Sequence, residues 1–577
     1  MKPTRLLPLC LAVLTSLSAH AQTINVEQKL KGIDVTITQI LKDWNVPGCG
    51  VGIVVKDKLV FANGYGYRNL ENKLPVTPNT LFQIASNTKL FTATAIGLLV
   101  TEGKLDWDLP VKKYIPGIEF YSDELTKSVT IRDMLSHRTG ISRHDNIWYR
   151  SDFTRQELFD RLKYLEPSIP FRQGYLYNNL MYAAAGSVVE YLSGQTWEAF
   201  VTERLFKPLG MSHSMFVTEE MIRQPDFMTP YYEKRDSTIL LPYPFYTRFQ
   251  GVGPCGSIIS SINDLSNWMI AQLHNGRFNN QQVIPVAVFR ETLQPAGLSA
   301  SVPDKYFENL NSMYGMGRST SSYKGHYRVQ HTGAIGGIYS IVSILPVDSI
   351  GIIVFTNGAH AGSLPGIIAN TLYDKLLDLE VTPWSERNLK DYQKNKITDR
   401  EARNKPDVDR VPDTRPSHPL KDFAGSFEDA AYGVVKIEER GGVLWFNYNT
   451  MMLPLHHYHY DRFVSEDDEL NGKWSLLFTT DAQGTVQNIR TSMDEKEVVF
   501  VRKADARLSD PAFLKTLVGT YELNGNTISL IISNNQLIVA GSPPQHLDPY
   551  KGMTFRIREF SDQTVEFILD ESNKPTG

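Results

Sequence analysis

Residues 86–100 read Ser-Asn-Thr-Lys-Leu-Phe-Thr-Ala-Thr-Ala-Ile-Gly-Leu-Leu-Val, and the run stops at Glu102-Gly103. This apolar stretch predicts a buried helix that starts at Ser86. Residues three apart share a helix face, so Ser86 and Lys89 should point to the same place. Burial and the positive end of the helix both lower the pKa of a lysine, and a neutral amine can accept a serine proton. The spacing therefore predicts a nucleophile, Ser86, with a basic partner, Lys89.

A second Ser-x-x-Lys, Ser321-Ser-Tyr-Lys324, provides an internal comparison. Gly325 follows its lysine directly, and no helical apolar pattern continues beyond it. This copy is expected to be a coincidence of spacing in a loop. The spacing alone is a weak signal, and its context singles out Ser86.

Two further segments place polar side chains beside predicted elements. Tyr177-Asn178-Asn179 precedes the apolar run Leu180–Leu192, which predicts a helix ended by Ser193-Gly194. His331-Thr332-Gly333 leads into Ile338–Leu345, which predicts the first strand of a hairpin with Ile350–Phe355. Nearer the N-terminus, Val51–Phe61 predicts a buried strand with a turn at Lys56-Asp57-Lys58.

A serine-lysine helix, a Tyr-x-Asn loop and a basic residue before Thr-Gly follow the order of motifs in penicillin-recognising enzymes. Residues from 28 to 385 resemble the β-lactamase-related serine hydrolases, which include class C β-lactamases, D-alanyl-D-alanine carboxypeptidases, D-aminopeptidases and related esterases (peptidase family S12). Longer signature-like segments extend the resemblance: residues 134–140, 177–186, 205–211 and 256–265. It implies an α+β β-lactamase/transpeptidase-like catalytic domain, in which an antiparallel sheet flanked by helices meets a helical region at the active site.

The resemblance also implies catalytic roles. Ser86 would be acylated, while Lys89 and Tyr177 share the proton transfers, and either of the two could be the base. Asn179 would hydrogen-bond the substrate amide, although Asn also favours capping a helix such as the one that follows. His137, inside one of the signature-like segments, is expected to be structural.

His331, Thr332 and Gly333 would line the substrate-binding site. The backbone N–H groups of Ser86 and Ala334 would form the oxyanion hole. No metal or other cofactor is expected. His456, His457 and His459 lack a convincing third ligand position, since only two of them share a strand face.

One position departs from the penicillin-recognising enzymes, because His331 stands where they usually have lysine. A lysine there is a permanent cation that can hold a substrate carboxylate, whereas imidazole is mostly neutral at pH 7. The histidine therefore favours esters or amides whose groups near the reacting bond are uncharged over β-lactams or D-Ala-D-Ala peptides.

The bulk composition narrows the class of protein. Of the 577 residues, 42% are apolar, which is ordinary for a globular protein. The formal net charge is −4, and the lack of a positive excess argues against a nucleic-acid binder. Lys2 and Arg5, the apolar stretch Leu6–Leu17 and Ala19-His20-Ala21 predict a signal peptide, residues 1–21, cleaved before Gln22. We expect a secreted or periplasmic protein without a transmembrane segment, and the oligomeric state stays open. Cys49 and Cys255 are expected to be buried free thiols.

The chain divides into several expected parts. A hydrolase domain spans 22–385, and a charged, proline-rich linker spans 386–417. A weak repeat, in which Leu420–Glu428 resembles Leu514–Glu522, predicts two all-β, barrel-like domains at 418–504 and 508–577, the second of them incomplete. They resemble lipocalin-like modules, and we expect them to shape access to Ser86.

Three functions are compatible with the sequence. The leading one is an exported serine hydrolase that acts on an ester, amide or short peptide as its small-molecule or short-peptide substrate. The second is a penicillin-binding or sensor-type protein that is acylated with little turnover. A third is that the barrels bind an apolar ligand which the hydrolase domain processes.

Overall fold

The structure is a computed structural model that describes residues 25–299, 305–405, 407–482, 484–494, 496–523, 525–570 and 576. The predicted signal peptide and its cleavage site lie outside the described residues. Within this part of the chain, no helix combines the length and apolar character that a membrane span requires.

A nine-stranded antiparallel sheet forms the centre of the N-terminal domain. In spatial order its strands are β10 (Gly297–Leu298), β11 (Asn309–Tyr314), β12 (Ser319–Tyr323), β13 (His326–Ile335), β14 (Ile338–Leu345), β15 (Ile350–Thr356), β1 (Gly48–Val55), β2 (Lys58–Asn69) and β3 (Leu74–Pro75). The predicted hairpin is confirmed, since β14 pairs with β15 from Tyr339–Thr356 to Leu345–Ile350. The run Val51–Phe61 is divided between β1 and β2 by the turn at Lys56, whose φ is 55°.

The alternation along β1 decides which helix covers which face of the sheet. Cys49, Val51 and Ile53 are buried with α2 (Ile33–Asp43) and α14 (Leu364–Leu376), whereas the glycines between them face α12 (Ile262–Leu273). A Cβ on Gly52 would lie 2.7 Å from Ile262 Cγ2. A Cβ on Gly351 of β15 would lie 2.2 Å from Met269 Sδ. Small residues in the sheet therefore let α12 pack closely against it.

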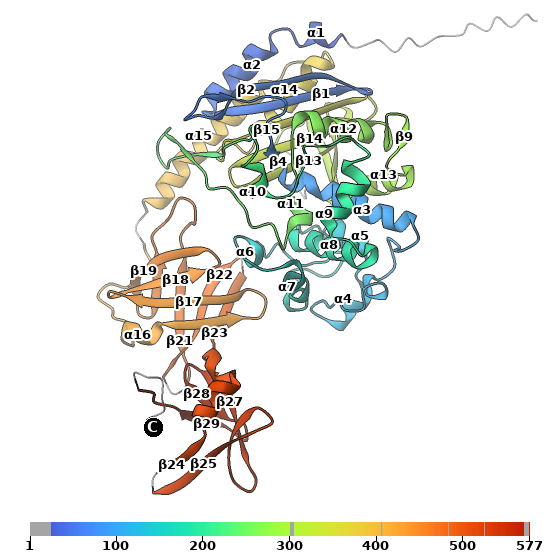
Figure 1. Cartoon of the computed structure of the whole chain (residues 1–577). Helices are drawn as coiled ribbons and strands as arrows, with labels where there is room; N and C mark the ends of the chain where they lie inside the picture. Colours follow the sequence, from blue (N-terminus) through green and yellow to red (C-terminus); the bar gives the residue numbers. More distant parts are fainter. Residues whose placement is uncertain are drawn as a thin grey trace, which may run out of the picture.

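A helical region lies against one side of this sheet and helix layer (Figure 1). The predicted helix at 86–100 is present as a single 3-10 turn, η1 (Ala85–Asn87), followed by α3 (Thr88–Thr101). The other predicted helix is α8 (Asn179–Ser193), which ends at Gly194 with a φ of 72°. The remaining helices of this region are α4 (Asp123–Ser128), α5 (Ile131–Leu135), α6 (Asp145–Trp148), α7 (Arg155–Asp160), α9 (Trp197–Val201), α11 (Gly253–Gly256) and α13 (Val286–Leu293).

Two all-β units follow and extend away from the sheet (Figure 1). The first is a closed barrel of β16 (Gly425–Asp429), β17 (Gly433–Arg440), β18 (Val443–Tyr448), β19 (Met451–His459), β20 (Arg462–Ser465), β21 (Ser475–Thr480), β22 (Val486–Met493) and β23 (Lys496–Arg502). The second is a six-stranded sheet in sequence order, β24 (Gly519–Leu523), β25 (Asn526–Ser533), β26 (Gln536–Val539), β27 (Gln545–Lys551), β28 (Thr554–Ile557) and β29 (Phe560–Glu566). The expected fold class, an α+β domain followed by all-β domains, is confirmed.

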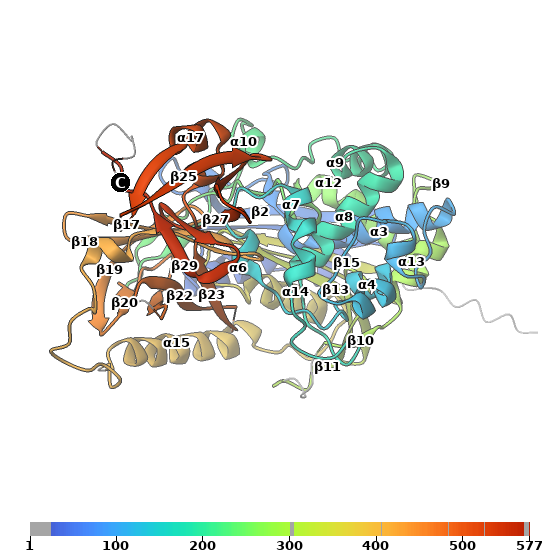
Figure 2. The ribbon, with the colours of Figure 1, turned by 90° about the horizontal axis from the view of Figure 1, so that it is seen from below.

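The first part of the segment expected to be a linker is the long helix α15 (Trp384–Arg403), which lies along one edge of the molecule in Figure 2. It is packed rather than free. Tyr392 and Lys396 donate hydrogen bonds to Glu233 at 2.9 and 2.7 Å, and Arg403 pairs with Asp236. Side-chain contacts from distant residues therefore fix a segment whose composition suggested a solvated connection.

Shorter elements complete the described chain. They are α1 (Val26–Lys29), β4 (Phe82–Gln83), η2 (Val111–Lys113), η3 (Leu162–Tyr164), η4 (Thr202–Phe206), α10 (Thr218–Met221), β5 (Tyr231–Glu233), β6 (Leu240–Pro242), β7 (Ile259–Ser260), β8 (Arg277–Phe278), β9 (Gln281–Gln282), α16 (Leu420–Phe423), η5 (Ala506–Ser509) and α17 (Pro511–Thr516).

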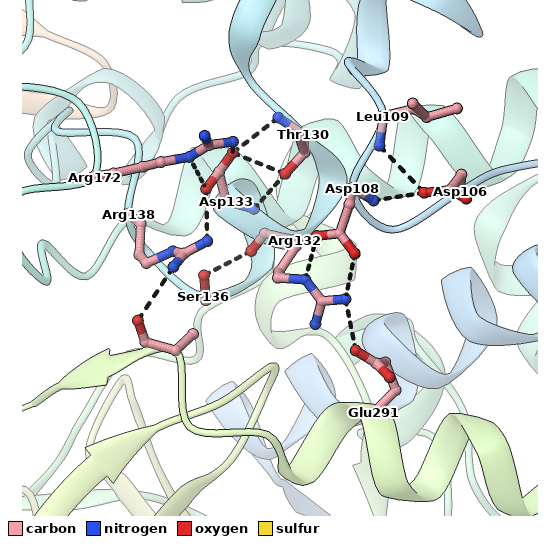
Figure 3. Close-up of polar contacts among 11 residues, drawn as sticks. Asp106, Asp108, Leu109, Thr130, Arg132, Asp133, Ser136, Arg138, Arg172 and Glu291 are labelled. Atoms are coloured by element: carbon pink, nitrogen blue, oxygen red, sulfur yellow. Dashed lines mark hydrogen bonds and ion pairs between the residues drawn. The ribbon is translucent and has the colours of Figure 1, made fainter.

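A buried carboxylate, Asp133, ties α5 to the loop that carries Tyr177 (Figure 3). Its two oxygens accept hydrogen bonds from Arg138 and Arg172 at 2.7–2.9 Å and from Thr130. Burial alone would raise the pKa of Asp133, but the hydrogen bonds from Arg172 and Thr130 hold it below its ordinary value. The carboxylate is thus ionised when folded, and its stabilising effect is present at neutral pH and lost as the pH falls through that lowered pKa.

Replacing Asp133 by Ala should destabilise the domain by about 3 kcal/mol, because it leaves two arginines around an empty carboxylate position. The midpoint of thermal unfolding at pH 7 measures this loss. Asp108, whose side chain is 68% exposed and pairs with Arg132, provides the matched control. Asp108→Ala should cost less than about 1 kcal/mol. Equal losses in the two variants would show that Asp133 has no special structural role.

Candidate active site

Ser86 lies at the floor of a cavity of about 650 Å³ between the sheet and the helical region. It is the only residue from Leu81 to Leu90 that is not fully buried. The preceding residue, Ala85, has a φ of 48°, an unusual value for a residue with a side chain. Strand β13 comes close at Gly333, where a Cβ would lie 2.2 Å from the Ile84 carbonyl oxygen. A backbone turn and a glycine in the neighbouring strand therefore set the position of the serine.

The Lys89 side chain is completely buried and reaches the serine. Its Nζ lies 3.0 Å from Ser86 Oγ, 2.8 Å from Asn179 Oδ1 and 2.9 Å from the Cys255 carbonyl oxygen. No carboxylate of the described residues lies within ion-pair distance of it. Burial lowers the pKa of Lys89 to about 8, so a sizeable fraction of the amine is neutral just above pH 7. The lysine is therefore placed to exchange a proton with the serine.

Tyr177 approaches the serine from the other side. Its hydroxyl donates a hydrogen bond to Ser86 Oγ at 2.9 Å. The Lys89 ammonium and the Arg143 guanidinium lie 4.9 and 5.1 Å from the centre of its ring. Burial raises the pKa of Tyr177 above its ordinary value, which favours the neutral phenol at neutral pH.

His137 supports the tyrosine from behind. It is fully buried, its ring centre is 4.4 Å from that of Tyr177, and its Nδ1 accepts a hydrogen bond from the Asn178 N–H at 3.1 Å. Burial lowers the pKa of His137 well below its ordinary value. The neutral ring packs against the site without contacting Ser86, which agrees with the structural role expected for it.

The two asparagines that follow Tyr177 make different hydrogen bonds. Asn178 is the cap of α8, and its Oδ1 accepts from the N–H groups of Leu180 and Met181. Asn179 is free of that role: its Oδ1 accepts from Lys89, and its Nδ2 donates to Asp145 Oδ1 at 3.0 Å. The capping alternative for Asn179 is therefore wrong, and its amide links the lysine to a carboxylate.

Asp145 is the side chain at the end of this link. Its Oδ1 also accepts from the Trp148 indole at 2.7 Å, and its Oδ2 pairs with Arg143 at 2.6 Å. Asp145 carries no local sequence motif, and it meets Asn179 only because α6 folds against the start of α8. Sequence reasoning missed Asp145 and Arg143 for this reason.

His331 lies on β13 with both ring nitrogens engaged by the protein. Its Nδ1 lies 2.6 Å from the Thr332 carbonyl oxygen, and its Nε2 lies 2.9 Å from the Tyr314 hydroxyl. Nδ1–H therefore donates to the carbonyl, and Nε2 accepts from the tyrosine. Burial and the nearby Lys89 lower the pKa of His331 to about 3, so the ring is neutral. The site has no cation at the position where the penicillin-recognising enzymes usually have lysine.

The rest of the cavity wall consists of other residues predicted for the site and of aromatic side chains. Thr332 and Ala334 line the cavity with Ser86, whereas Gly333 faces the Ile84 carbonyl. Aromatic side chains contribute much of the remaining wall: Trp148, Tyr149, Tyr175, Tyr243, Phe249, Tyr314 and Tyr339. None of these aromatic residues stood out in the sequence as a site residue.

The other candidate groups lie away from this cavity. Ser321 is on β12 and Lys324 is in the following turn, where its Nζ bonds Asp374 and the Glu380 carbonyl. His457 bonds the Tyr460 carbonyl at 2.7 Å, and His459 accepts from the Val411 N–H. Cys49 and Cys255 are buried free thiols, as expected.

Comparisons with known proteins identify the family of the N-terminal part of the chain. Residues 33–370 match the family described as Beta-lactamase, and residues 409–502 match a domain of unknown function (DUF3471). The chain is 28% identical over 431 residues to "Unguisins hydrolase ungD'" of Aspergillus campestris (strain IBT 28561), covering 70% of this chain and 77% of the relative. It is 27% identical over 335 residues to "Protein flp" of Staphylococcus aureus (strain COL), covering 56% of this chain and 62% of that protein.

Among solved structures, the octameric penicillin-binding protein homologue from Pyrococcus abyssi superposes with a TM-score of 0.54 at 20% identity. The match covers 88% of this chain and 98% of that one. At this identity the likeness shows a shared fold.

The buried lysine predicts how the reactivity of Ser86 depends on pH. Labelling of the serine by an uncharged fluorophosphonate should speed up with rising pH, with a midpoint near pH 8, because the neutral amine is the form that accepts a proton. Lys89→Met should slow labelling by about 100-fold or more, the lower range for general-base catalysis. Lys324→Met, in the second Ser-x-x-Lys, is the matched control and should label like the parent. A pH-independent labelling rate in the parent would contradict this account of Lys89.

Proposed function

Since the chain belongs to the beta-lactamase family, we propose that it is an exported serine hydrolase acting through an acyl-enzyme on Ser86. Its substrate would be an ester, an amide or a short peptide. The observation that carries the proposal is the meeting of three groups at one atom: Ser86 Oγ lies 3.0 Å from Lys89 Nζ and 2.9 Å from the Tyr177 hydroxyl. The name of the fungal relative, a hydrolase, supports the same reaction class.

The first half of the reaction forms the acyl-enzyme. Ser86 Oγ attacks the substrate carbonyl carbon while its proton passes to the neutral amine of Lys89. The negative charge that develops on the carbonyl oxygen would be held by the backbone N–H groups of Ser86 and Ala334, both of which line the cavity. Tyr177, protonated at neutral pH, would carry the proton from Lys89 to the leaving alcohol or amine.

The second half returns the enzyme to its starting state. A water molecule attacks the acyl carbonyl, and the amine of Lys89, alone or through Tyr177, accepts the water proton. Collapse of the intermediate breaks the bond to Ser86 Oγ, which regains its proton from the same pair. Both steps use the same three side chains, because the hydrogen bonds converge on one oxygen.

The cavity favours a substrate that is uncharged next to the reacting bond. His331 is neutral and has both ring nitrogens in use, and the nearby Arg143 is already paired with Asp145. The aromatic wall provides flat apolar surface for an acyl or leaving group. An ester or amide with apolar groups near the scissile bond suits this wall better than a small carboxylate-bearing β-lactam.

A second candidate function is a sensor-type protein that is acylated with little turnover. The neutral His331, in the place of a substrate-anchoring lysine, is the observation that favours it. The two candidates share the acylation step and differ in deacylation alone.

Replacing Ser86 by Ala should abolish covalent labelling by a fluorophosphonate and cleavage of p-nitrophenyl esters. Tyr177→Phe should retain labelling but lower turnover of an alkyl ester or an amide by roughly 100-fold, since proton transfer to the leaving group is impaired. A p-nitrophenyl ester should lose less, because p-nitrophenolate leaves without a proton. Intact-mass spectrometry during turnover separates the two functions: rapid loss of the acyl adduct supports the hydrolase, and a persistent adduct supports the sensor. Unchanged labelling of Ser86→Ala would refute both.

A further inference from the structure

A second, much smaller cavity lies behind the nucleophile helix. Its volume is about 30 Å³, and it is enclosed by α3, α12 and strands β13 and β14. Most of its wall is apolar: Leu90, Phe91, Leu265, Trp268, Val329, Val342 and Ile344. His331 lines both this cavity and the catalytic one.

Arg318, the residue just before β12, places a buried positive charge at this cavity. The residue is 2% exposed. Its Nη2 donates to Thr292 Oγ1 at 2.8 Å, but its Nε and Nη1 have no hydrogen-bond partner among the described residues. No described carboxylate lies within ion-pair distance of the guanidinium, although its carbon lies 5.1 Å from the Phe289 ring centre. Burial lowers the pKa of Arg318 to about 9, which leaves it cationic at neutral pH.

Gln272, on α12, adds a second unpartnered group to the same wall. It is 3% exposed, and neither its amide nitrogen nor its amide oxygen has a hydrogen-bond partner in the described chain. Buried polar groups almost always have partners, and an unpaired buried charge costs several kcal/mol. Two such groups facing one cavity indicate that something in the cavity bonds to both.

We propose that this cavity binds a single small monovalent anion, chloride in an ordinary buffer. The Arg318 guanidinium and the Gln272 amide N–H₂ can donate hydrogen bonds to a halide ion. The negative charge of the ion would neutralise the arginine. The space holds a guest of about the size of a water molecule or a halide ion, which favours a small anion over a large one. A bound water would satisfy some of the donors but would leave the charge unpaired. The anion would join β12, α12 and α3 behind His331.

The test measures thermal unfolding of the full chain at constant ionic strength while sodium gluconate is replaced by sodium chloride. The expected result is a saturable rise in midpoint of roughly 2 °C or more, because a ligand of the native state stabilises it by mass action. Crystals grown in sodium bromide should show an anomalous peak in the cavity between Arg318 and Gln272. A chloride-independent midpoint together with a water in the cavity would overturn the proposal.

Two variants make the result specific. Gln272→Glu places a carboxylate beside the guanidinium and should raise the midpoint in gluconate while removing the chloride effect. Arg318→Met removes the charge and should also remove the chloride effect, whatever its own stability. Gln281→Glu, on the exposed strand β9, controls for a surface charge and should keep the chloride response. A chloride response that survives in both cavity variants would place the anion elsewhere.

A separate set of contacts connects the barrel to the catalytic lysine. The segment 143–149, which includes the one-turn helix α6, supplies Arg143, Asp145, Trp148 and Tyr149 to the catalytic cavity. A four-residue helix makes few bonds within itself, so outside contacts must hold this segment. Figure 1 shows α6 at the face of the domain that meets the barrel.

Both backbone groups of Asn146 are bonded to barrel side chains. Its N–H donates to Asp494 Oδ2 at 3.0 Å, and its carbonyl accepts from the Tyr448 hydroxyl at 2.9 Å. Asn449 Nδ2 lies 3.2 Å from the same carbonyl and 2.9 Å from that of Tyr149. The barrel therefore fixes the backbone on the C-terminal side of Asp145.

We infer that these barrel residues position Asp145 and, through Asn179, the amine of Lys89. Lys89 Nζ donates to Asn179 Oδ1, and Asn179 Nδ2 donates to Asp145 Oδ1. Asp145 is joined through the backbone to Asn146, whose N–H donates to Asp494 of the barrel. Burial lowers the pKa of Lys89, and the Arg143 charge lowers it further, whereas Cys255 and the Asp145 charge oppose this shift. This inference rests on the proposed function and extends it, since the barrel would then control the base as well as access to the cavity.

The experiment compares pH profiles of kcat and KM for a p-nitrophenyl ester in the full chain. Asp494→Ala and Asn449→Ala should lower kcat by roughly tenfold with little change in KM, because the base is displaced from its partner. They should also shift the rising limb of the profile, which reports loss of the Lys89 proton, to lower pH, the direction expected when the Asp145 charge moves away from Lys89. Asp494→Asn keeps an acceptor for the Asn146 N–H and should restore both values.

Lys496→Ala is the matched control, because Lys496 bonds the Glu166 carbonyl across the same interface but not the 143–149 segment. It should leave kcat and the profile unchanged. If Asp494→Ala and Asn449→Ala match the parent in kcat and in the pH profile, the barrel does not position Lys89. The proposed hydrolase function would be unaffected by that result. Activity that survives Ser86→Ala would instead refute the proposed function, so the two failures are distinguishable.

Discussion

The burial of Lys89 without a carboxylate in contact is the constraint on which the site depends. An ammonium group sealed in the interior is costly, and the cost is reduced when the proton leaves. The three acceptors around Nζ orient the amine but none of them is an anion: a serine hydroxyl, an asparagine amide and the Cys255 carbonyl. A carboxylate in direct contact would keep the lysine charged and unable to act as a base. The nearest such group, Asp145, is held one amide away behind Asn179.

The fold supplies this environment from segments far apart in sequence. Glycines in β1 and β15 let α12 pack closely, and Gly333 in β13 lets the sheet approach the turn that carries the serine. α11 directs the Cys255 carbonyl at the amine, and the Asp133 cluster holds the loop before Tyr177. His137 packs against the Tyr177 ring, and the burial of Tyr177 raises its pKa, which keeps the phenol protonated at neutral pH. Together these features bury Lys89 and Tyr177, and burial is the main cause of the shifted pKa of each.

The sequence allowed the residues around Ser86 to be predicted. The partners of those residues could not be predicted, because they depend on contacts between segments far apart in the chain. Ser86 and Lys89 lie three residues apart, so helical spacing predicted that they meet, although that signal alone is weak. The order of the three motifs and the resemblance to the β-lactamase-related hydrolases supplied the role of Tyr177. The sheet's hairpin and the all-β C-terminal units also followed from alternation and turns. The partner of Asn179 could not be foreseen, because Asp145 meets it only after α6 folds onto α8. The engagement of both nitrogens of His331, the packing of α15 and the barrel contacts to Asn146 depend in the same way on tertiary structure.

The most direct test of the central claim is a crystal structure of the protein after reaction with a fluorophosphonate. The account predicts a bond from phosphorus to Ser86 Oγ, with Lys89 Nζ and the Tyr177 hydroxyl each within about 3.2 Å of that oxygen, which is hydrogen-bond distance. It also predicts that no carboxylate contacts Lys89. An adduct on another residue, or a Lys89 paired directly with an aspartate or glutamate, would contradict it.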